Sequence, residues 1–340
     1  MVHFGQPVAS DSPHLAEADL GSLGQLVMAP EQHFVRTHGI TPSLDAQSWR
    51  LVVDGAVKTP LSLDLAELRR RPRHSVLAVM ECAGNGRRYF TDPVDGDPWG
   101  DGAASCSHWS GARLADLLAE ARPAGDAVDV VCVGASSEAA ADFARGLPLA
   151  VALAPETLVA FEHGGRPLLP EHGAPLRLVV PTWYGVAWVK WLHRLTVSTT
   201  PYCGYWNTER YVLRKPGRAD EPLGVLRCKS VITAPRAGST AAAGPLRVAG
   251  LAWSGAGPVS AVEVSTDAGR TWQHAEITES AGSMGWVRWC AVLELPPGQH
   301  DVRSRATDSA GRVQPAPEQV KWNAFGYGYD GSVDVGFTLR

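Results

Sequence analysis

The segment ECAGNGRR, residues 81 to 88, contains the side chains with the clearest chemical potential in this chain. Its Cys82 follows the apolar run 75–80, which predicts a strand, and precedes a turn rich in glycine and asparagine. The thiolate form of cysteine binds metals and attacks electrophiles, and nearby positive charge lowers the pKa of a thiol. Arg87 and Arg88 follow the turn and would supply that charge. The segment therefore indicates a metal-binding or reactive thiolate at Cys82.

The turn after Cys82 contains two glycines, Gly84 and Gly86. Glycine adopts backbone conformations that are closed to other residues, so the pair would let the chain turn sharply around a bulky cofactor. The segment alone fits a second interpretation equally well, a buried cysteine near a turn, because most free cysteines behave as small apolar side chains. Other segments have to decide between the two.

Two more groups of polar residues occur in apolar surroundings. Arg36 and His38 stand two positions apart at the end of a predicted strand, a pattern that more often marks a solvated surface. His172, Arg177 and Lys190 belong to an apolar, tryptophan-rich segment, where burying cations without partners is costly. A bound phosphate would satisfy all three. Ion pairs with carboxylates of the same chain are the alternative.

The elements that position these residues indicate a mixed α+β domain. A helix is predicted over 64–71, with Asp64 as its N-cap, and a second over 112–122. The apolar runs 127–135 and 176–181 predict buried strands.

The pattern changes at residues 215–224, a polar connector that contains proline and glycine. Beyond it helix signals disappear, and short alternating strands are separated by turns such as DAGR and DSAGR. This spacing is typical of an immunoglobulin-like sandwich. We therefore expect a catalytic domain over residues 1–225 and an all-β immunoglobulin-like domain over 226–340.

Composition excludes several classes of protein. The 340 residues are 45% hydrophobic and have a net charge of −4, which argues against a general nucleic-acid binder. No apolar run is long enough for a membrane helix, and no signal peptide is recognised in residues 1–30, so we expect a cytoplasmic protein. The six cysteines form no Cys-x-x-Cys pair, which argues against a disulfide framework, a zinc finger and a c-type haem site.

CAGNGR resembles the C-A-G-N-x-R motif of the sulfite oxidase family of molybdenum enzymes. Further segments resemble the same family in the same order: HWSGARLADLL, HGAPLRLVVP with GVAWVKWL, GLAWSGAGPVSAVEVSTDAGRTWQ and VQPAPEQVKWNAFGYG. The resemblance covers roughly residues 30 to 328. It implies a molybdopterin-binding domain followed by an immunoglobulin-like dimerisation domain, and hence a homodimer.

The resemblance also implies roles for individual residues. Cys82 would be the sole protein ligand to molybdenum, beside the dithiolene sulfurs of molybdopterin. Arg36 and Arg87 would lie near the substrate anion, and the hydroxyl of Tyr211 would face the substrate. The pterin or its phosphate would be held by His38, His172, Arg177 and Lys190. Trp99 would stand near the wall of the pocket.

The activity that the resemblance implies is oxidation of sulfite to sulfate by oxygen-atom transfer, with electrons passed to an external acceptor such as a cytochrome or oxygen. We expect no haem in this chain, no nucleic-acid partner and no membrane partner. The same cofactor acting on another sulfur or nitrogen oxyanion, or on an organic sulfoxide, is the enzymatic alternative. A non-enzymatic immunoglobulin-like binding protein is the other alternative.

Some positions depart from the family pattern. Thr37 replaces an asparagine of many relatives, and Ala187 with Trp188 replaces an Arg-His pair of some. Asp334 aligns near an arginine of some relatives, and its carboxylate would weaken anion attraction if it reached the pocket. These departures bear on the substrate more than on the cofactor.

Overall fold

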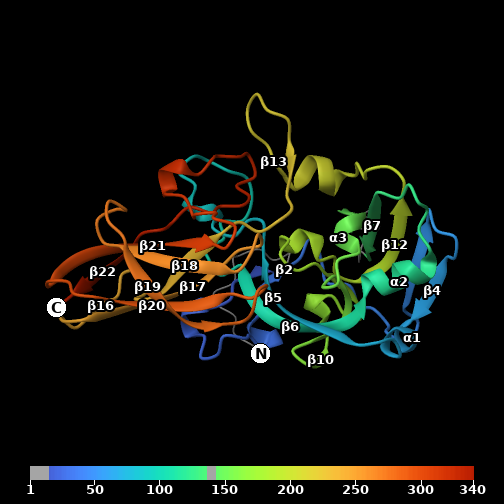
Figure 1. The fold of residues 1–340 in the computed structure, drawn as a ribbon, viewed down its shortest axis with the longest axis horizontal. Helices are drawn as coiled ribbons and strands as arrows, with labels where there is room; N and C mark the ends of the chain where they lie inside the picture. Colours follow the sequence, from blue (N-terminus) through green and yellow to red (C-terminus); the bar gives the residue numbers. More distant parts are fainter. Residues whose placement is uncertain (1–14, 136–142) are drawn as a thin grey trace.

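The computed structural model describes residues 15–135 and 143–340, and strands dominate its regular structure (Figure 1). In Figure 1 the C-terminal strands, orange to red, form the left-hand part, and blue to green strands form most of the right-hand part. The strands of the N-terminal part are β1 (Leu15–Ala16), β2 (Val35–Arg36), β3 (Arg50–Gly55), β4 (Leu61–Asp64), β5 (His74–Glu81), β6 (Ala104–Arg113), β7 (Asp129–Gly134), β8 (Phe143–Pro148), β9 (Leu158–His163), β10 (Arg166–Pro167), β11 (Arg177–Val179) and β12 (Leu192–Ser198).

The strand that leads to Cys82 belongs to a five-stranded sheet with the order β10-β9-β6-β5, in which β11 also pairs with β9. β5 and β6 pair antiparallel along their length, up to Glu81 opposite Ala104. The amide of Cys82 donates to the carbonyl of Ala103 at 2.8 Å, so the ladder continues one residue further. This pairing fixes where the chain leaves the sheet, and the predicted strand over 75–80 is confirmed.

A second five-stranded sheet has the order β4-β3-β12-β7-β8, with β12 parallel to β3 and antiparallel to β7. Its inward side chains, such as Leu51, Val53 and Val130, belong to the same apolar core as those of the first sheet. The predicted strands over 127–135 and 176–181 are confirmed as β7 and β11.

Three α-helices are found in the described residues: α1 (Leu65–Arg69), α2 (Leu114–Ala121) and α3 (Leu149–Ala152). Asp64 caps α1 as predicted, because its carboxylate accepts from the amide of Glu67 at 2.7 Å. The side chain of Glu67 accepts in return from the amide of Asp64 at 2.8 Å, which completes a capping box. α2 confirms the second predicted helix and buries Leu114, Leu117 and Leu118.

The C-terminal part is all β, as predicted. After the short pair β13 (Val212–Leu213) and β14 (Glu221–Pro222), eight strands follow the hydrogen-bonded order β15-β17-β20-β19-β18-β21-β22-β16. Side chains from strands that are distant in this order, such as Val248, Val302 and Phe337, share one core, so the sheet folds over on itself. The eight strands are β15 (Lys229–Ala234), β16 (Thr240–Ala241), β17 (Leu246–Trp253), β18 (Val259–Ser265), β19 (Gln273–Ser280), β20 (Val287–Leu293), β21 (Gly298–Asp308) and β22 (Val335–Leu339).

The two parts share apolar packing. Trp253 and Trp286 of the C-terminal part, with Phe325 and Tyr327, belong to the core of the N-terminal part. The predicted boundary at residues 225/226 falls in the segment between β14 and β15 and stays a prediction. Across the described residues, no helix combines the length and apolar character needed to cross a bilayer.

Candidate active site

A cavity of about 300 Å³ collects residues that lie far apart in the sequence, from Phe34 to Tyr211. Its wall includes the thiol of Cys82, which follows β5, and Arg36, which ends β2. Seven of the eight predicted site residues line it: Arg36, His38, Cys82, His172, Arg177, Lys190 and Tyr211. These residues span 176 positions of sequence, and the fold brings them to one place.

The turn that presents Cys82 is closed by backbone bonds and by one asparagine. The amide of Asn85 donates to the carbonyl of Cys82 at 3.0 Å. The side chain of Asn85 donates to Glu81 Oε1 at 2.9 Å and accepts from the amide of Ala103 at 3.1 Å. Asn85 is therefore the residue that ties the turn to both neighbouring strands.

The environment of the Cys82 thiol differs from the prediction. Burial raises its pKa, and the opposing charges of Arg36 and Arg87 do not reverse this. Arg88 is exposed, and its Nε donates to the carbonyl of Pro98 at 3.2 Å. The prediction that adjacent arginines lower the pKa of this thiol is wrong in its net direction, because desolvation outweighs them. A bound metal cation would supply the missing charge, since it deprotonates a coordinating thiol.

The glycines of the turn serve packing rather than cofactor access. A Cβ on Gly84 would stand 2.6 Å from Arg87 Nη2, so this glycine makes room for the guanidinium. Gly86 has a φ of +81°, and its open side faces Tyr329 and Lys229 of the C-terminal part. Gly84 and Gly86 therefore make room for neighbouring side chains and do not provide the expected clearance for a cofactor.

The two predicted substrate arginines have different surroundings. Arg36 lines the cavity, its Nη1 is buried without a hydrogen-bond partner among the described residues, and its Nη2 lies 3.9 Å from Asp97 Oδ2. Arg87 does not line the cavity. Its Nε donates to the carbonyl of Phe325 at 2.9 Å and its Nη1 to that of Asp97 at 2.7 Å. Arg36 is therefore the arginine whose charge is available to a ligand in the cavity.

His38 and Tyr211 form a pair at the cavity wall, with His38 Nε2 2.7 Å from the tyrosine hydroxyl. Although the side chain of His38 is exposed in the cavity, the surrounding protein partly desolvates its ring. This desolvation, with the charges of Arg36, Arg210 and Lys190, lowers the pKa of His38 to about 3. The imidazole is neutral at pH 7, so it can hold a proton on one ring nitrogen and accept one on the other.

Two further cations, Arg177 and Lys190, line the same cavity. Arg177 is fully buried, and donates to the carbonyls of His172 at 2.9 Å and Trp188 at 3.0 Å. Burial lowers its pKa to about 9. Lys190 Nζ donates to Thr37 Oγ1 at 2.7 Å, and burial with the charge of Arg177 lowers its pKa well below the usual value.

The cations of the cavity suit the phosphate-bearing cofactor that the sequence resemblance implies. In the ranges 15–135 and 143–340 neither Arg177 nor Lys190 forms a salt bridge with a carboxylate, so the ion-pair alternative is not observed. Arg177 Nε and Arg36 Nη1 are both buried donors that lack partners in the described part of the chain. Unpaired buried donors are costly, and an anionic group in the cavity would satisfy them. A thiol and several cations in one cavity suit a phosphate-bearing cofactor with a thiolate-bound metal.

Comparison with known proteins decides the family. Residues 38–206 match the oxidoreductase molybdopterin binding domain, and residues 221–329 match the Mo-co oxidoreductase dimerisation domain. The chain is 35% identical to sulfite oxidase from Gallus gallus over 349 aligned positions, which cover 95% of this chain and 76% of that protein.

The chain belongs to the sulfite oxidase family. It is also 34% identical to the mitochondrial sulfite oxidase of Homo sapiens, of which it covers 64%. The crystal structure of the sulfane dehydrogenase SoxCD from Paracoccus pantotrophus is similar, with a TM-score of 0.86 and 30% identity over 96% of this chain and 85% of that chain. The protein is a molybdopterin-dependent oxidoreductase, so the alternative of a non-enzymatic binding protein is wrong.

The positions that depart from the family pattern have local structural explanations. Thr37 keeps a polar role, because it accepts from Lys190. Trp188 is buried against the cavity, and its backbone carbonyl accepts from Arg177. Asp334 does not reach the cavity, since its carboxylate pairs with Arg303 through bonds of 2.7 and 2.6 Å in the C-terminal part. The concern that Asp334 weakens anion attraction is therefore removed.

Trp99 is not in the cavity wall. It is fully buried in the core beside the loop that follows Cys82. The prediction that Trp99 stands near the pocket wall is wrong, because its side chain packs into the apolar core instead.

Several cavity residues were not foreseen. Phe143, Trp191 and Trp206 form an aromatic wall of the cavity. Met80 also lines the cavity, and its sulfur contacts Arg177. Arg145 supports Trp206 by donating to its backbone carbonyl. No local sequence signal marks these residues, because aromatic and sulfur side chains in strands and turns read as ordinary core.

Proposed function

We propose that this protein oxidises sulfite to sulfate. The observation that carries the proposal is that the Cys82 thiol, the unpaired Nη1 of Arg36 and the Tyr211 hydroxyl border one cavity, which Arg177 and Lys190 also line. A small oxyanion beside the thiol would meet the charge of Arg36.

The bound molybdenum–molybdopterin centre would supply two-electron oxygen-atom chemistry, with Cys82 as the sole protein ligand. Arg36 would attract and orient the oxyanion in a site that is partly shielded from water. Tyr211 would donate a hydrogen bond toward substrate, and neutral His38 at 2.7 Å would hold the hydroxyl in place. His172, Arg177 and Lys190 would bind the pterin and its phosphate. Arg87 would contribute positive charge from behind the turn rather than contact with the substrate.

A larger sulfur compound is the second candidate substrate. The aromatic wall formed by Phe143, Trp191 and Trp206 would accommodate a less hydrated molecule than sulfite. The similar crystal structure is named a sulfane dehydrogenase, which is consistent with a family that acts on more than one sulfur substrate.

The test is sulfite-dependent reduction of ferricyanide by molybdenum-replete protein. We expect saturable turnover that is lost in Cys82→Ser and retained in Cys203→Ser, since Cys203 is exposed and lies outside the cavity. No turnover with sulfite in protein that contains molybdenum and pterin would overturn the sulfite assignment. Turnover with an organic sulfur compound in the same preparation would support the second candidate.

The rest of the assembly is part of the same proposal. We infer a homodimer formed through the C-terminal domain, in line with the dimerisation domain matched at 221–329. We also propose a cytoplasmic location, an external electron acceptor such as a cytochrome or oxygen, and no haem in this chain. The domain boundary is proposed at residues 225/226.

A further inference from the structure

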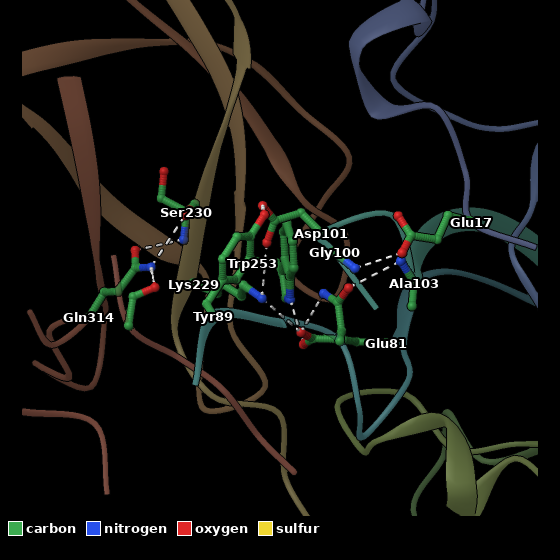
Figure 2. Close-up of polar contacts among 12 residues, drawn as sticks. Glu17, Glu81, Tyr89, Gly100, Asp101, Ala103, Lys229, Ser230, Trp253 and Gln314 are labelled. Carbon is green, nitrogen blue, oxygen red and sulfur yellow. Dashed lines mark hydrogen bonds and ion pairs between the residues drawn. The ribbon is translucent and has the colours of Figure 1, made fainter. Parts of the chain in front are cut away.

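The residue before Cys82 is bound by the C-terminal domain. Glu81 is 2% exposed, and its Oε2 accepts from Trp253 Nε1 at 2.9 Å. Its Oε1 accepts from Asn85 at 2.9 Å and lies 3.8 Å from Lys229 Nζ. Figure 2 shows Lys229 and Trp253 converging on Glu81 from the C-terminal strands. A buried carboxylate needs such partners, so its position depends on them.

Lys229 and Trp253 are presented as one unit. They lie directly opposite each other where β15 pairs with β17. Lys229 is 1% exposed, and its Nζ also lies 3.4 Å from Asp101 Oδ1, on the loop between β5 and β6. The hydroxyl of Tyr89 donates to Asp101 Oδ2 at 2.8 Å. One ammonium therefore stands between two carboxylates, and removing it would leave two like charges facing each other.

The residue after Cys82 is bound by the same domain. The amide of Gly328 donates to the carbonyl of Ala83 at 2.7 Å. Cys82 is thus flanked on both sides by residues that the C-terminal domain holds. Asn85 links Glu81 to the amide of Ala103, whose carbonyl accepts from the amide of Cys82. A shift of Glu81 would reach the backbone of Cys82 through the side chain of Asn85 and the backbone of Ala103.

We propose that the C-terminal domain positions the metal ligand, with Lys229 and Trp253 acting on Cys82 through Glu81 and Asn85. The inference rests on the proposed function in one respect, that Cys82 ligates molybdenum. It assigns the domain a role in the active site in addition to dimerisation. Lys229 and Trp253 are positioning residues, because neither lines the cavity.

The test uses the full-length, molybdenum-loaded protein and the electron paramagnetic resonance spectrum of its Mo(V) state. Trp253→Phe removes the indole donor to Glu81. We expect shifted g-values, about a 10-fold lower kcat with unchanged KM, and reduced molybdenum content, as is usual when a residue that orients a metal ligand is lost. The matched control is Trp286→Phe, an equally buried indole whose Nε1 donates to the carbonyl of Leu26 at 2.7 Å.

Several outcomes separate the role in positioning from simple domain packing. Destabilisation in urea by both variants, with a shifted spectrum in Trp253→Phe alone, supports the inference. A wild-type spectrum in Trp253→Phe, together with an altered one in Cys82→Ser, overturns it and leaves the proposed function standing. An unaltered spectrum in Cys82→Ser overturns the ligand assignment and this inference with it. If Trp253→Phe does not fold, Lys229→Gln is measured instead, and its spectrum and its unfolding in urea are interpreted in the same way.

Discussion

At the scale of single residues, the site is defined by cationic side chains whose hydrogen-bonding capacity is only partly satisfied by the described residues. Arg36 and Arg177 each have a buried nitrogen without a partner among the described residues, and Lys190 has only neutral acceptors. Such groups lower the stability of the folded chain unless a ligand satisfies them. Their presence in one cavity is therefore stronger support for an anionic ligand than the identity of any one of them.

Arg36 gives a direct test of substrate binding. Because a hydrogen bond to a charged group contributes about 1.5–3 kcal/mol, Arg36→Gln should lower kcat/KM for sulfite at least about 10-fold. Arg88→Gln is the matched control, since Arg88 is exposed and does not line the cavity. Steady-state kinetics at a series of sulfite concentrations measures both. Equal effects of the two substitutions would contradict the assignment of Arg36.

A cluster of three buried histidines adjoins the cavity, and one of them, His172, lines it. The rings of His33, His163 and His172 stand 5.1 to 5.2 Å apart, and His163 stacks on Trp109 at 3.9 Å. Both ring nitrogens of His163 lack a hydrogen-bond partner in the described part of the chain. Burial, with the positive charge of Arg177 as a smaller cause, lowers the pKa of each of these histidines.

This burial predicts a loss of stability in acid. In the unfolded chain each histidine takes up a proton near pH 6.5, but in the folded protein it stays neutral to a much lower pH. Below pH 6.5 the unfolded state binds more protons, so the free energy of unfolding falls by about 1.4 kcal/mol per histidine per pH unit. His163→Phe keeps the stacking and should reduce this slope by one histidine's contribution.

Urea unfolding at pH 7, 6 and 5 measures the slope. The matched control is His274→Phe, since His274 is exposed. If the free energy of unfolding of His163→Phe falls with pH as steeply as that of the unmodified protein, His163 is not held neutral by the fold.

At the scale of elements, local sequence signals were reliable where the interaction itself is local. The capping box of α1 joins residues three positions apart, and the pairing of Asp64 with Glu67 was readable from the sequence. The apolar runs that became β5, β7 and β11 were readable for the same reason. Trp99 was misplaced, because its position is set by packing in the apolar core and not by a local signal.

The cap of α1 provides a test of element stability. Asp64→Ala removes the acceptor for the amide of Glu67 and should lower the free energy of unfolding by about 1 kcal/mol. Asp64→Asn keeps an acceptor oxygen and should cost less. Urea denaturation of the two variants compares them. A loss as large in Asp64→Asn as in Asp64→Ala would mean that the charge of Asp64, and not its cap bond, is responsible.

At the scale of the whole molecule, the C-terminal domain is continuous with the catalytic core. Trp253, Phe325 and Tyr327 pack into it, and Glu81 is bonded across the junction. The proposed dimer predicts a sedimenting mass of twice the 36.2 kDa chain. Analytical ultracentrifugation over a range of concentrations measures this mass. A single-chain mass at micromolar concentration would contradict the homodimer.

The sequence by itself determined the class of fold, the thiol motif and the set of cations, because these depend on residue type and on spacing within short segments. It also carried the family resemblance, since the matching segments keep their order along the chain. The tertiary structure alone decided which groups meet. It showed that burial raises the pKa of Cys82 against its arginines, that Arg87 faces away from the cavity, and that the C-terminal domain holds Glu81. Desolvation and long-range contacts arise only when distant segments pack together, so no local pattern could report them.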